Sequence, residues 1–354
     1  MDIYVLNSSF EKIGIIDTYQ SIIWTTRYYA PGDFELYISA RKDILDLLQV
    51  DYMLVRDKDI VGDECHNVMM IRNIEIQSDA ESGDSIIITG ECLKSIVKRR
   101  VIANQTNLSG TVENSIRSLI TQNIISPSDT DRAISNFVLG TDGDLTTANM
   151  TMQITGDNLA DALAEICTTY GYGWDVFIKD SNFVFYIYEG KDRSFEQSTN
   201  PHVVFSTEYD NLLSSDYKED RSLYANVAVV AGEGEGTARK KVTVGTATGL
   251  NRFEIWVDQR DTSSNDGEIT DAEYQELLEQ AGVEALAETG ITTEFTGEVL
   301  PDVNFVYGVD YFLGDVVQIE NDYGVSKAAR ITEIIESEDE SGKTVIPTFE
   351  EGGF

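Results

Sequence analysis

The sequence predicts a mainly β protein with α+β insertions, made of two related β-barrel domains and a small α+β domain between them. Three observations indicate this fold class. Short segments rich in Ile, Val, Thr and Tyr recur at both ends of the chain and are separated by turn residues. Segments with helical periodicity occupy the middle, and one ten-residue segment of the first third has a counterpart near the C-terminus.

Residues 1–100 are expected to form the first barrel. A short amphipathic helix is expected at residues 41–50, and a second helix near Cys92 to Arg100 ends the unit. Short strands at this spacing are typical of a barrel or a sandwich. The strands are expected at residues 3–6, 12–16, 21–29, 32–38, 52–56, 68–77 and 85–90.

Residues 101–210 are expected to form the α+β domain. Residues 111–125 have helical periodicity, and Pro127 lies just beyond their end. A second helix over residues 158–170 has Asp157 as its expected N-cap and Gly171 as its C-terminal glycine. Two strands, 173–178 and 183–188, follow as a hairpin.

Residues 211–354 are expected to form the second barrel, with an inserted helix at about 270–288. The β pattern returns after Tyr209 and continues to the end of the chain. Strands are expected at residues 223–231, 239–244, 252–257, 315–320, 327–336 and 344–349.

Two acidic Ser-Gly segments suggest that the barrels are related. Ser78–Ile87 aligns without gaps to Ser337–Ile346, with five identities and three conservative exchanges in ten positions. Convergence of two acidic hairpins is the alternative. Duplication predicts that the two hairpins occupy equivalent places in the strand order, and unrelated strand orders would refute it.

Charge and cysteine content exclude several classes of protein. The chain has 62 acidic and 26 basic residues and a formal net charge of −36, which excludes nucleic-acid binding through a basic surface. Three cysteines without Cys-x-x-Cys spacing argue against a disulfide framework and a structural zinc site. We find neither a signal-peptide pattern nor an apolar run of membrane-spanning length, so this chain is not expected to enter a membrane.

No catalytic, cofactor-binding or metal-binding residue is predicted, and no cofactor. His66 adjoins Cys65, but such a pair alone is too small a ligand set for zinc. Carboxylate pairs are inevitable among 62 acids, so they give little support to a glycosidase. Gly232–Gly236 resembles a phosphate loop but lacks the Lys-Ser/Thr ending, and it is expected to be a hairpin loop.

The segment 262–273 partly fits a calcium-binding loop. Position 1 is Thr262 instead of Asp, and a strand precedes the segment. The competing interpretation is a capping box, Thr270-x-x-Glu273, that opens the long helix. The residues at loop positions 3, 5, 6, 8 and 12 are Ser264, Asp266, Gly267, Ile269 and Glu273.

Basic and aromatic clusters have structural and functional interpretations. The cations Lys94, Lys98, Arg99 and Arg100 are expected to stabilise a helix end through the helix dipole, and the alternative is a contact with a neighbouring acidic subunit. Trp24, Tyr28, Tyr29 and Trp256 are expected in the core. Exposure of these aromatics would instead favour a carbohydrate-binding or receptor-binding module.

The order of motifs resembles the tail-tip or baseplate hub family of siphophages. This family is similar in fold to the N-terminal part of tail-associated lysins and to the central hub of contractile-tail baseplates. The resemblance covers essentially the whole chain. The motifs that carry it are Tyr28–Leu36, Asn226–Gly236, Phe295–Val299, Tyr307–Val317 and Ala329–Ile334.

The resemblance implies a structural hub in the virion, at the phage tail tip, assembled in the host cytoplasm. It implies a homotrimer whose paired barrels form a pseudo-sixfold ring in contact with the tail tube, a distal tail ring, and tape-measure and spike or fibre proteins. The acidic excess suggests a lumen through which DNA passes without specific binding.

Enzymatic activity is not expected, because lysin-type hubs carry their enzyme after the hub and this chain stops at Phe354, soon after the last expected strand. The alternatives are a tail-associated cell-wall-degrading enzyme with paired carboxylates and a tail-tip receptor-binding or carbohydrate-binding module.

Overall fold

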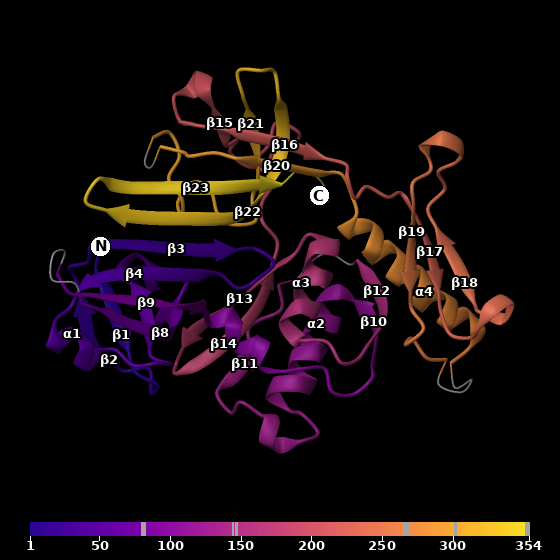
Figure 1. Cartoon of the computed structure of the whole chain (residues 1–354), viewed down its shortest axis with the longest axis horizontal. Helices are drawn as coiled ribbons and strands as arrows, with labels where there is room; N and C mark the ends of the chain where they lie inside the picture. Colours follow the sequence, from indigo (N-terminus) through magenta and orange to yellow (C-terminus); the bar gives the residue numbers. More distant parts are fainter. Residues whose placement is uncertain (79–82, 144, 146–147, 265–268, 301–302, 351–354) are drawn as a thin grey trace.

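The largest element of the protein is one sheet of thirteen strands that includes both ends of the chain (Figure 1). The computed structural model describes residues 1–78, 83–143, 145, 148–264, 269–300 and 303–350. The N-terminal strands, in indigo, lie beside the C-terminal strands, in yellow (Figure 1). The predicted mainly β class with α+β insertions is confirmed.

The first half of this sheet has the strand order β3-β4-β9-β8-β5-β1-β2. Its strands alternate apolar and polar residues, as in β4, where Phe34, Leu36 and Ile38 are buried. The helix α1 (Lys42–Leu47) follows β4. The strands are β1 (Ile3–Leu6), β2 (Lys12–Ile16), β3 (Ser21–Arg27), β4 (Asp33–Ser39), β5 (Met53–Arg56), β8 (Met69–Gln77) and β9 (Ser85–Cys92).

The second half has the order β16-β20-β23-β22, and β22 also pairs with β21, which pairs with β15. One edge of the long strand β22 pairs with β23, and the other pairs first with β21 and then with β3. The strands are β15 (Val204–Ser206), β16 (Asp216–Asp220), β20 (Thr292–Thr296), β21 (Val316–Glu320), β22 (Ser326–Asp339) and β23 (Gly342–Glu350).

The expected barrels are not closed within the single chain. In a closed first barrel, both edges of β3 would pair with strands of the first half. Instead, β3 pairs with β4 on one edge and with β22 on the other, from Ser21–Asp339 to Arg27–Glu333. The two halves therefore share one continuous sheet, because the edge that would close the first barrel is occupied by the second half.

The two halves repeat one strand order. The order β3-β4-β9-β8-β5 corresponds to β16-β20-β23-β22-β21, and each long hairpin has a β-bulge one residue after an isoleucine, Ile71 or Ile331. This agreement is what duplication predicts. Equivalent cross-strand pairs are Ile71–Gly90 and Ile331–Phe349, Ile74–Ile88 and Ile334–Pro347, Ile76–Ile86 and Glu336–Val345, and Gln77–Ser85 and Ser337–Thr344.

The gapless alignment of Ser78–Ile87 with Ser337–Ile346 is offset by one residue where it matches the end of β8 to the end of β22. It pairs Ser78 with Ser337, whereas the registers make Gln77 the equivalent of Ser337. The first hairpin has one residue more between its paired strands. Residues 79–82 of that turn lie outside the described residues.

In its described residues the middle unit has two α-helices and two sheets. The pair β10-β12 forms one sheet, and β11-β14-β13-β7-β6 forms the other, which includes β6 and β7 from the N-terminal unit. Helix α3 is capped by Asn158 and not by the expected Asp157, and Gly171 ends it at a φ of 71°. The elements are β6 (Ile60–Val61), β7 (Glu64–Cys65), β10 (Thr106–Thr111), α2 (Val112–Ile120), β11 (Phe137–Leu139), β12 (Asn149–Ile154), α3 (Leu159–Tyr170), β13 (Gly173–Lys179) and β14 (Asn182–Tyr188).

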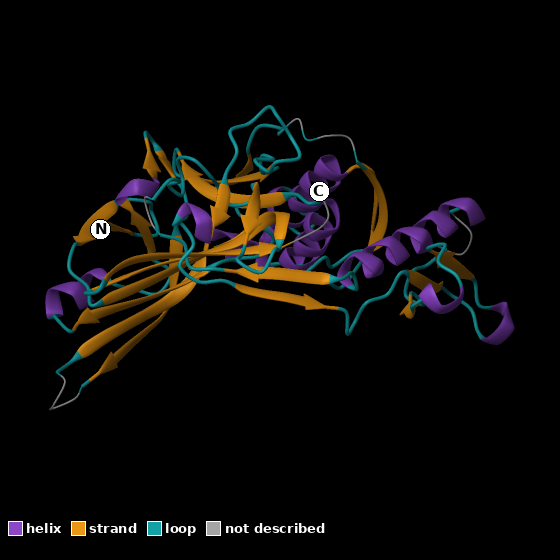
Figure 2. Ribbon diagram, turned by 90° about the horizontal axis from the view of Figure 1, so that it is seen from above, coloured by secondary structure: helices purple, strands orange, loops and turns teal. Residues whose placement is uncertain are grey.

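A third unit projects from the main body (Figure 2). The strands β17 (Val227–Ala231), β18 (Lys241–Val244) and β19 (Glu254–Asp258) were expected in the second barrel, but they form a separate sheet of their own. Helix α4 (Asp271–Glu288) packs on this sheet through Tyr274 and Leu278. The whole unit is inserted between β16 and β20, where the first repeat has only the short connection from β3 to β4.

Candidate functional site

Three of the resemblance motifs meet at the buried side chain of Tyr28. Its hydroxyl donates a hydrogen bond to the Gly171 carbonyl at 3.1 Å. Its ring lies against Gly314, whose φ is 93°, and a Cβ added to Gly314 would lie 2.2 Å from the ring. Arg330 donates to the Gly314 carbonyl at 2.7 Å, and its guanidinium lies 5.4 Å from the Tyr28 ring. These motifs therefore hold the N-terminal, middle and C-terminal units together.

A buried ion network lies where β22 meets the first repeat. Arg56 is fully buried, donates to Glu336 at 2.6 Å and also pairs with Asp59. Lys58 pairs with Glu336 as well. Burial alone would raise the pKa of Glu336, but the charges of Arg56 and Lys58 lower it to about 2. Glu336 is therefore ionised at neutral pH and links the two repeats.

One face of the continuous sheet is acidic, and it is opposite the face that carries the apolar cores around Phe34 and Phe349. Arg27 lies on it at the junction of the repeats, paired with Asp33 and with Glu333, each at 2.6 Å. Lys218 also lies there and pairs with Asp220 at 3.3 Å. Strand alternation places these acids on the same face: Asp33, Glu35, Glu75, Glu91, Asp216, Asp220, Glu333, Asp339 and Glu350.

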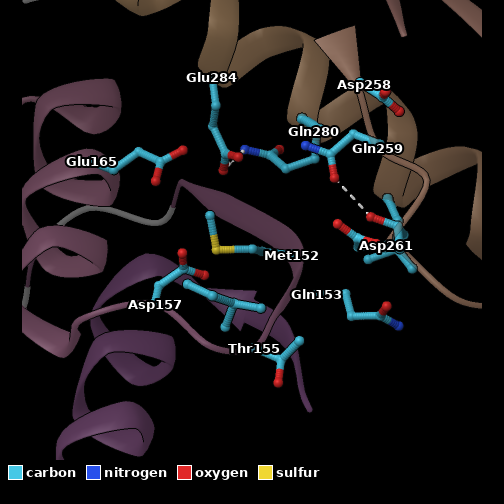
Figure 3. Close-up of a pocket in the computed structure, with 14 residues that line it drawn as sticks. Met152, Gln153, Thr155, Asp157, Glu165, Asp258, Gln259, Asp261, Gln280 and Glu284 are labelled. Carbon is cyan, nitrogen blue, oxygen red and sulfur yellow. Dashed lines mark hydrogen bonds between the residues drawn. The ribbon is translucent and has the colours of Figure 1, made fainter. Parts of the chain in front are cut away.

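An acidic hollow of about 350 Å³ lies between the middle unit and the projecting unit. Glu165 of α3 and Glu284 of α4 point into the same end of it (Figure 3). Burial raises the pKa of Glu284 to about 7, although Gln280 donates a hydrogen bond to its carboxylate at 2.9 Å and so opposes the shift. Burial also raises the pKa of Glu165. Asp157, Asp258 and Asp261 also line it, and its lining includes neither histidine nor cysteine.

This hollow is the arrangement that a carboxylate enzyme would use, because Glu284 could hold a proton near neutral pH. The same side chains also form the contact between two structural units, and their pKa values are raised mainly by burial and further by neighbouring carboxylates. Nothing in the sequence singled them out, since their positions in α3 and α4 follow ordinary helical patterns.

The other sequence candidates have structural roles. His66 contacts Glu64 at 3.0 Å and stacks on Phe177. The three cysteines are free thiols. Gly232–Gly236 joins β17 to β18 as the predicted hairpin. Across the described part of the chain, no group of three His, Cys, Asp or Glu side chains is suited to a metal ion.

The capping box is confirmed. The Glu273 carboxylate accepts from the Thr270 amide at 2.7 Å, and the Thr270 hydroxyl accepts from the Glu273 amide at 3.2 Å. Residues 265–268, which include Asp266 and Gly267 of the candidate calcium loop, lie outside the described residues.

The basic cluster does not form one patch. It lies on a 3-10 helix, Leu93–Arg99, with Lys98 and Arg99 in the last turn as the dipole interpretation expects. Lys94 is instead buried and donates to the carbonyls of Arg27 and Tyr28. Lys98 pairs with Glu91, Arg99 contacts Asp51, and Arg100 donates to the Arg132 carbonyl.

The aromatic prediction is confirmed for Trp24 and Tyr28, which are buried, and Tyr29 is partly buried. It is wrong for Trp256, which is 54% exposed. Arg239 and Lys241 lie over its ring at 5.6 and 5.2 Å. Trp256 is exposed because its neighbours in β19, Ile255 and Val257, pack toward α4, so its ring lies on the opposite face of the small projecting sheet.

The fold is that of phage tail proteins. A tail protein from Neisseria meningitidis MC58 has a TM-score of 0.61 at 14% identity, and the match covers 99% of this chain and 96% of that one. The 43 kDa tail protein of prophage MuSo2 from Shewanella oneidensis has a TM-score of 0.59 at 14% identity, over 99% and 98%. Prophage tail protein gp18 from Listeria monocytogenes EGD-e has a TM-score of 0.53 at 12% identity, over 100% and 95%.

The chain belongs to the Siphovirus ReqiPepy6 Gp37-like protein family, whose model matches residues 2–349. The resemblance to a siphophage family is thereby confirmed, and the fold of the chain is that of the phage tail proteins named above. No curated protein matches it. In the described residues, none of the helices is long and apolar enough to span a membrane.

Proposed function

We propose that this protein is the structural hub of a siphophage tail tip and that three copies form a pseudo-sixfold ring. The observation that carries this proposal is the repeated strand order joined edge to edge in one sheet. One chain already places two equivalent units next to each other, so three copies supply six. Such a ring matches a sixfold tail tube on one side and offers threefold symmetry on the other.

The acidic face of the sheet lines the lumen in this proposal. The cations Arg27 and Lys218 on this face are both ion-paired with acids of the same face, so they are poorly placed to bind a phosphate. A negative wall repels the DNA backbone and avoids ion pairs that would slow its passage. DNA then passes without specific binding.

In this proposal residues 1–100 supply one ring unit, and residues 211–354 without the inserted unit of β17, β18, β19 and α4 supply the other. Residues 101–210 supply the α+β domain. The tail tube docks on the sixfold side, and a distal tail ring, the tape-measure protein and spike or fibre proteins lie around and below. The ring is a virion component assembled in the host cytoplasm. Its role is structural and not enzymatic.

Light scattering on the full chain tests the trimer. The chain mass is 39.4 kDa, and a mass three times as large is expected at high concentration. Two results together would argue against the ring: a mass that stays at that of one chain at every concentration, and failure of the chain to assemble on tail tubes purified without the hub. Release of sugars or peptides from purified host cell walls would instead favour the paired-carboxylate enzyme.

A binding role is the second candidate, because Trp256 is exposed beside two cations on the projecting unit. Exposed indole rings stack on sugar rings and on peptide side chains. Trp256→Ala should abolish binding of the full chain to host cell walls if this candidate holds. Trp24→Phe is unsuitable as a control because Trp24 is buried, so Tyr323→Ala, at another exposed aromatic, is the matched variant.

A further inference from the structure

The equivalent strands β8 and β22 differ at their outer edges. In β22, residues 333–339 pair with β3 of the other repeat. The equivalent residues of β8, 73–77, pair with β9 on one edge, and within the described residues no strand pairs with their other edge. One edge position of the repeat is therefore filled within the chain, and its counterpart is open.

Side-chain exposure gives a second sign of a missing neighbour. Ile76 of β8 and Glu336 of β22 are equivalent, since they pair with Ile86 and Val345. Glu336 is 5% exposed because β3 and Arg56 cover it. Ile76 points to the same apolar side of the sheet as the buried Ile86 and yet is 55% exposed. A core-facing isoleucine is thus left uncovered at an open strand edge.

The matching open edge belongs to β16. This strand is the equivalent of β3: Tyr217 lies opposite Phe295 as Trp24 lies opposite Phe34, with ring centroids 6.5 and 5.7 Å apart. Among the described residues β16 pairs only with β20. It therefore presents to solvent the edge that β3 uses to bind β22.

We propose that β8 of one copy pairs with β16 of a second copy, antiparallel and in the register of β22 with β3. This inference rests on the proposed trimer and names its interface. Transfer of the register places Asn73 opposite Asp220, Ile74 opposite Glu219, Glu75 opposite Lys218, Ile76 opposite Tyr217 and Gln77 opposite Asp216 of the second copy.

The side chains brought together by this register are complementary. Glu75 meets Lys218, so opposite charges lie directly across from each other. Ile76 meets the partly buried ring of Tyr217, which covers its exposed surface. The pairing also satisfies two rows of backbone hydrogen-bonding groups that would otherwise template unwanted association.

The proposed pairing closes the sheet into one barrel. Each copy contributes the path β16-β20-β23-β22-β3-β4-β9-β8, whose two ends are the two open edges. Three copies joined end to end leave no edge in this path. A barrel with that many strands is wide enough to hold an aqueous channel, which the acidic face would line.

Cysteine cross-linking of the full chain tests the register. The variant Glu75→Cys/Lys218→Cys, made in a Cys65→Ser background, should give covalent dimers and trimers with a short thiol cross-linker, because directly opposite Cβ atoms lie about 5 Å apart. The control Glu75→Cys/Glu219→Cys places the second thiol on the other face of the same strand and should give at least tenfold less product.

The outcomes separate this inference from the proposed function. A trimer by light scattering with the Glu75–Lys218 cross-link supports both. A trimer in which that pair fails to cross-link, or cross-links no better than the control, overturns the strand pairing and leaves the hub standing. A chain that stays monomeric and without cross-links at all concentrations and on tail tubes overturns both.

Discussion

The two repeats of the sheet share a strand order, but the side chain at one equivalent position is buried in one repeat and exposed in the other. In the second repeat this position is Glu336, a buried carboxylate paired with Arg56 across the junction. In the first it is Ile76, an exposed apolar side chain. The difference shows that burial at a strand edge is decided by the neighbouring strand and not by residue type. An inward-facing residue that is exposed thus indicates where a neighbour is missing.

The repeats also differ in what connects their first two strands. A short loop joins β3 to β4, whereas the whole unit of β17, β18, β19 and α4 separates β16 from β20. The sheet tolerates this insertion because it emerges at strand ends and leaves both strand edges free to pair. The common part of the repeats is therefore the five-stranded order, and the insertion is an addition to it.

The largest effect expected is on the junction that is filled. Glu336→Gln leaves Arg56 buried with one carboxylate fewer, so the free energy of unfolding should fall by about 3 to 5 kcal/mol. Urea denaturation at pH 7 measures it. The control Glu333→Gln removes a carboxylate of the same strand that shares Arg27 with Asp33, and it should cost about 1 kcal/mol or less.

Equal costs for the two variants would contradict the importance of burial at this position. The pH dependence gives a second check. The pKa of Glu336 is lowered to about 2 in the folded protein, below about 4.3 in the unfolded chain. Its contribution to stability should therefore be complete above about pH 4.3 and be lost as the pH falls toward 2.

The next effect concerns the motif contact between the repeats and the middle unit. Gly314→Ala adds a Cβ 2.2 Å from the ring of Tyr28 at a φ of 93°, so it should cost about 2 to 4 kcal/mol. Gly324→Ala has a similar φ of 85° with no atom within 4 Å of the added Cβ, and it should cost about 1 kcal/mol. Thermal unfolding of both variants separates packing from backbone strain, and equal losses would refute the packing role.

A gain in stability is expected where the inserted unit contacts the middle unit. The pKa of Glu284 is raised to about 7, so ionisation of its carboxyl destabilises the folded chain progressively from about pH 4.5 to 7. Glu284→Gln should stabilise the protein by about 2 kcal/mol at pH 8 and by less at pH 5. The exposed Glu276→Gln of the same helix should change little at either pH, and a loss of stability in Glu284→Gln at pH 8 would contradict the account.

The smallest effect on the single chain is expected at the open edge. Ile76→Thr removes exposed apolar surface, so the free energy of unfolding of the monomer should change by less than about 0.5 kcal/mol. The same substitution should weaken association at least tenfold, because Ile76 would lose its contact with Tyr217 of the second copy. Sedimentation at several concentrations measures the association of copies. An Ile76→Thr variant that associates as strongly as the original chain would argue against the pairing of β8 with a second copy.

Much of the fold could be predicted from local patterns in the sequence. The strand expected at residues 32–38 from its β-forming residues is β4, and Thr270 with Glu273 identified the start of α4. The acidic hairpins indicated the repeat. These features depend on neighbours in sequence, which is why they were readable without a structure.

The remaining features depend on contacts between distant residues. Nothing near Glu336 in sequence identifies Arg56 as its partner or β3 as the strand beside it. The pairing of β3 with β22, which leaves the expected barrels open, and the separate sheet containing Trp256 are likewise long-range outcomes. The one-residue difference between the hairpins became visible only from the cross-strand registers.

The most direct test of the central claim is an electron-microscopy map of the tail tip at a resolution that separates strands. We predict three copies of this chain, with β8 and β22 at the same radius in six equivalent positions and with Glu35, Glu75 and Glu333 facing the axis. A copy number other than three, or repeats that lie at different radii from the axis, would contradict the paired-repeat ring.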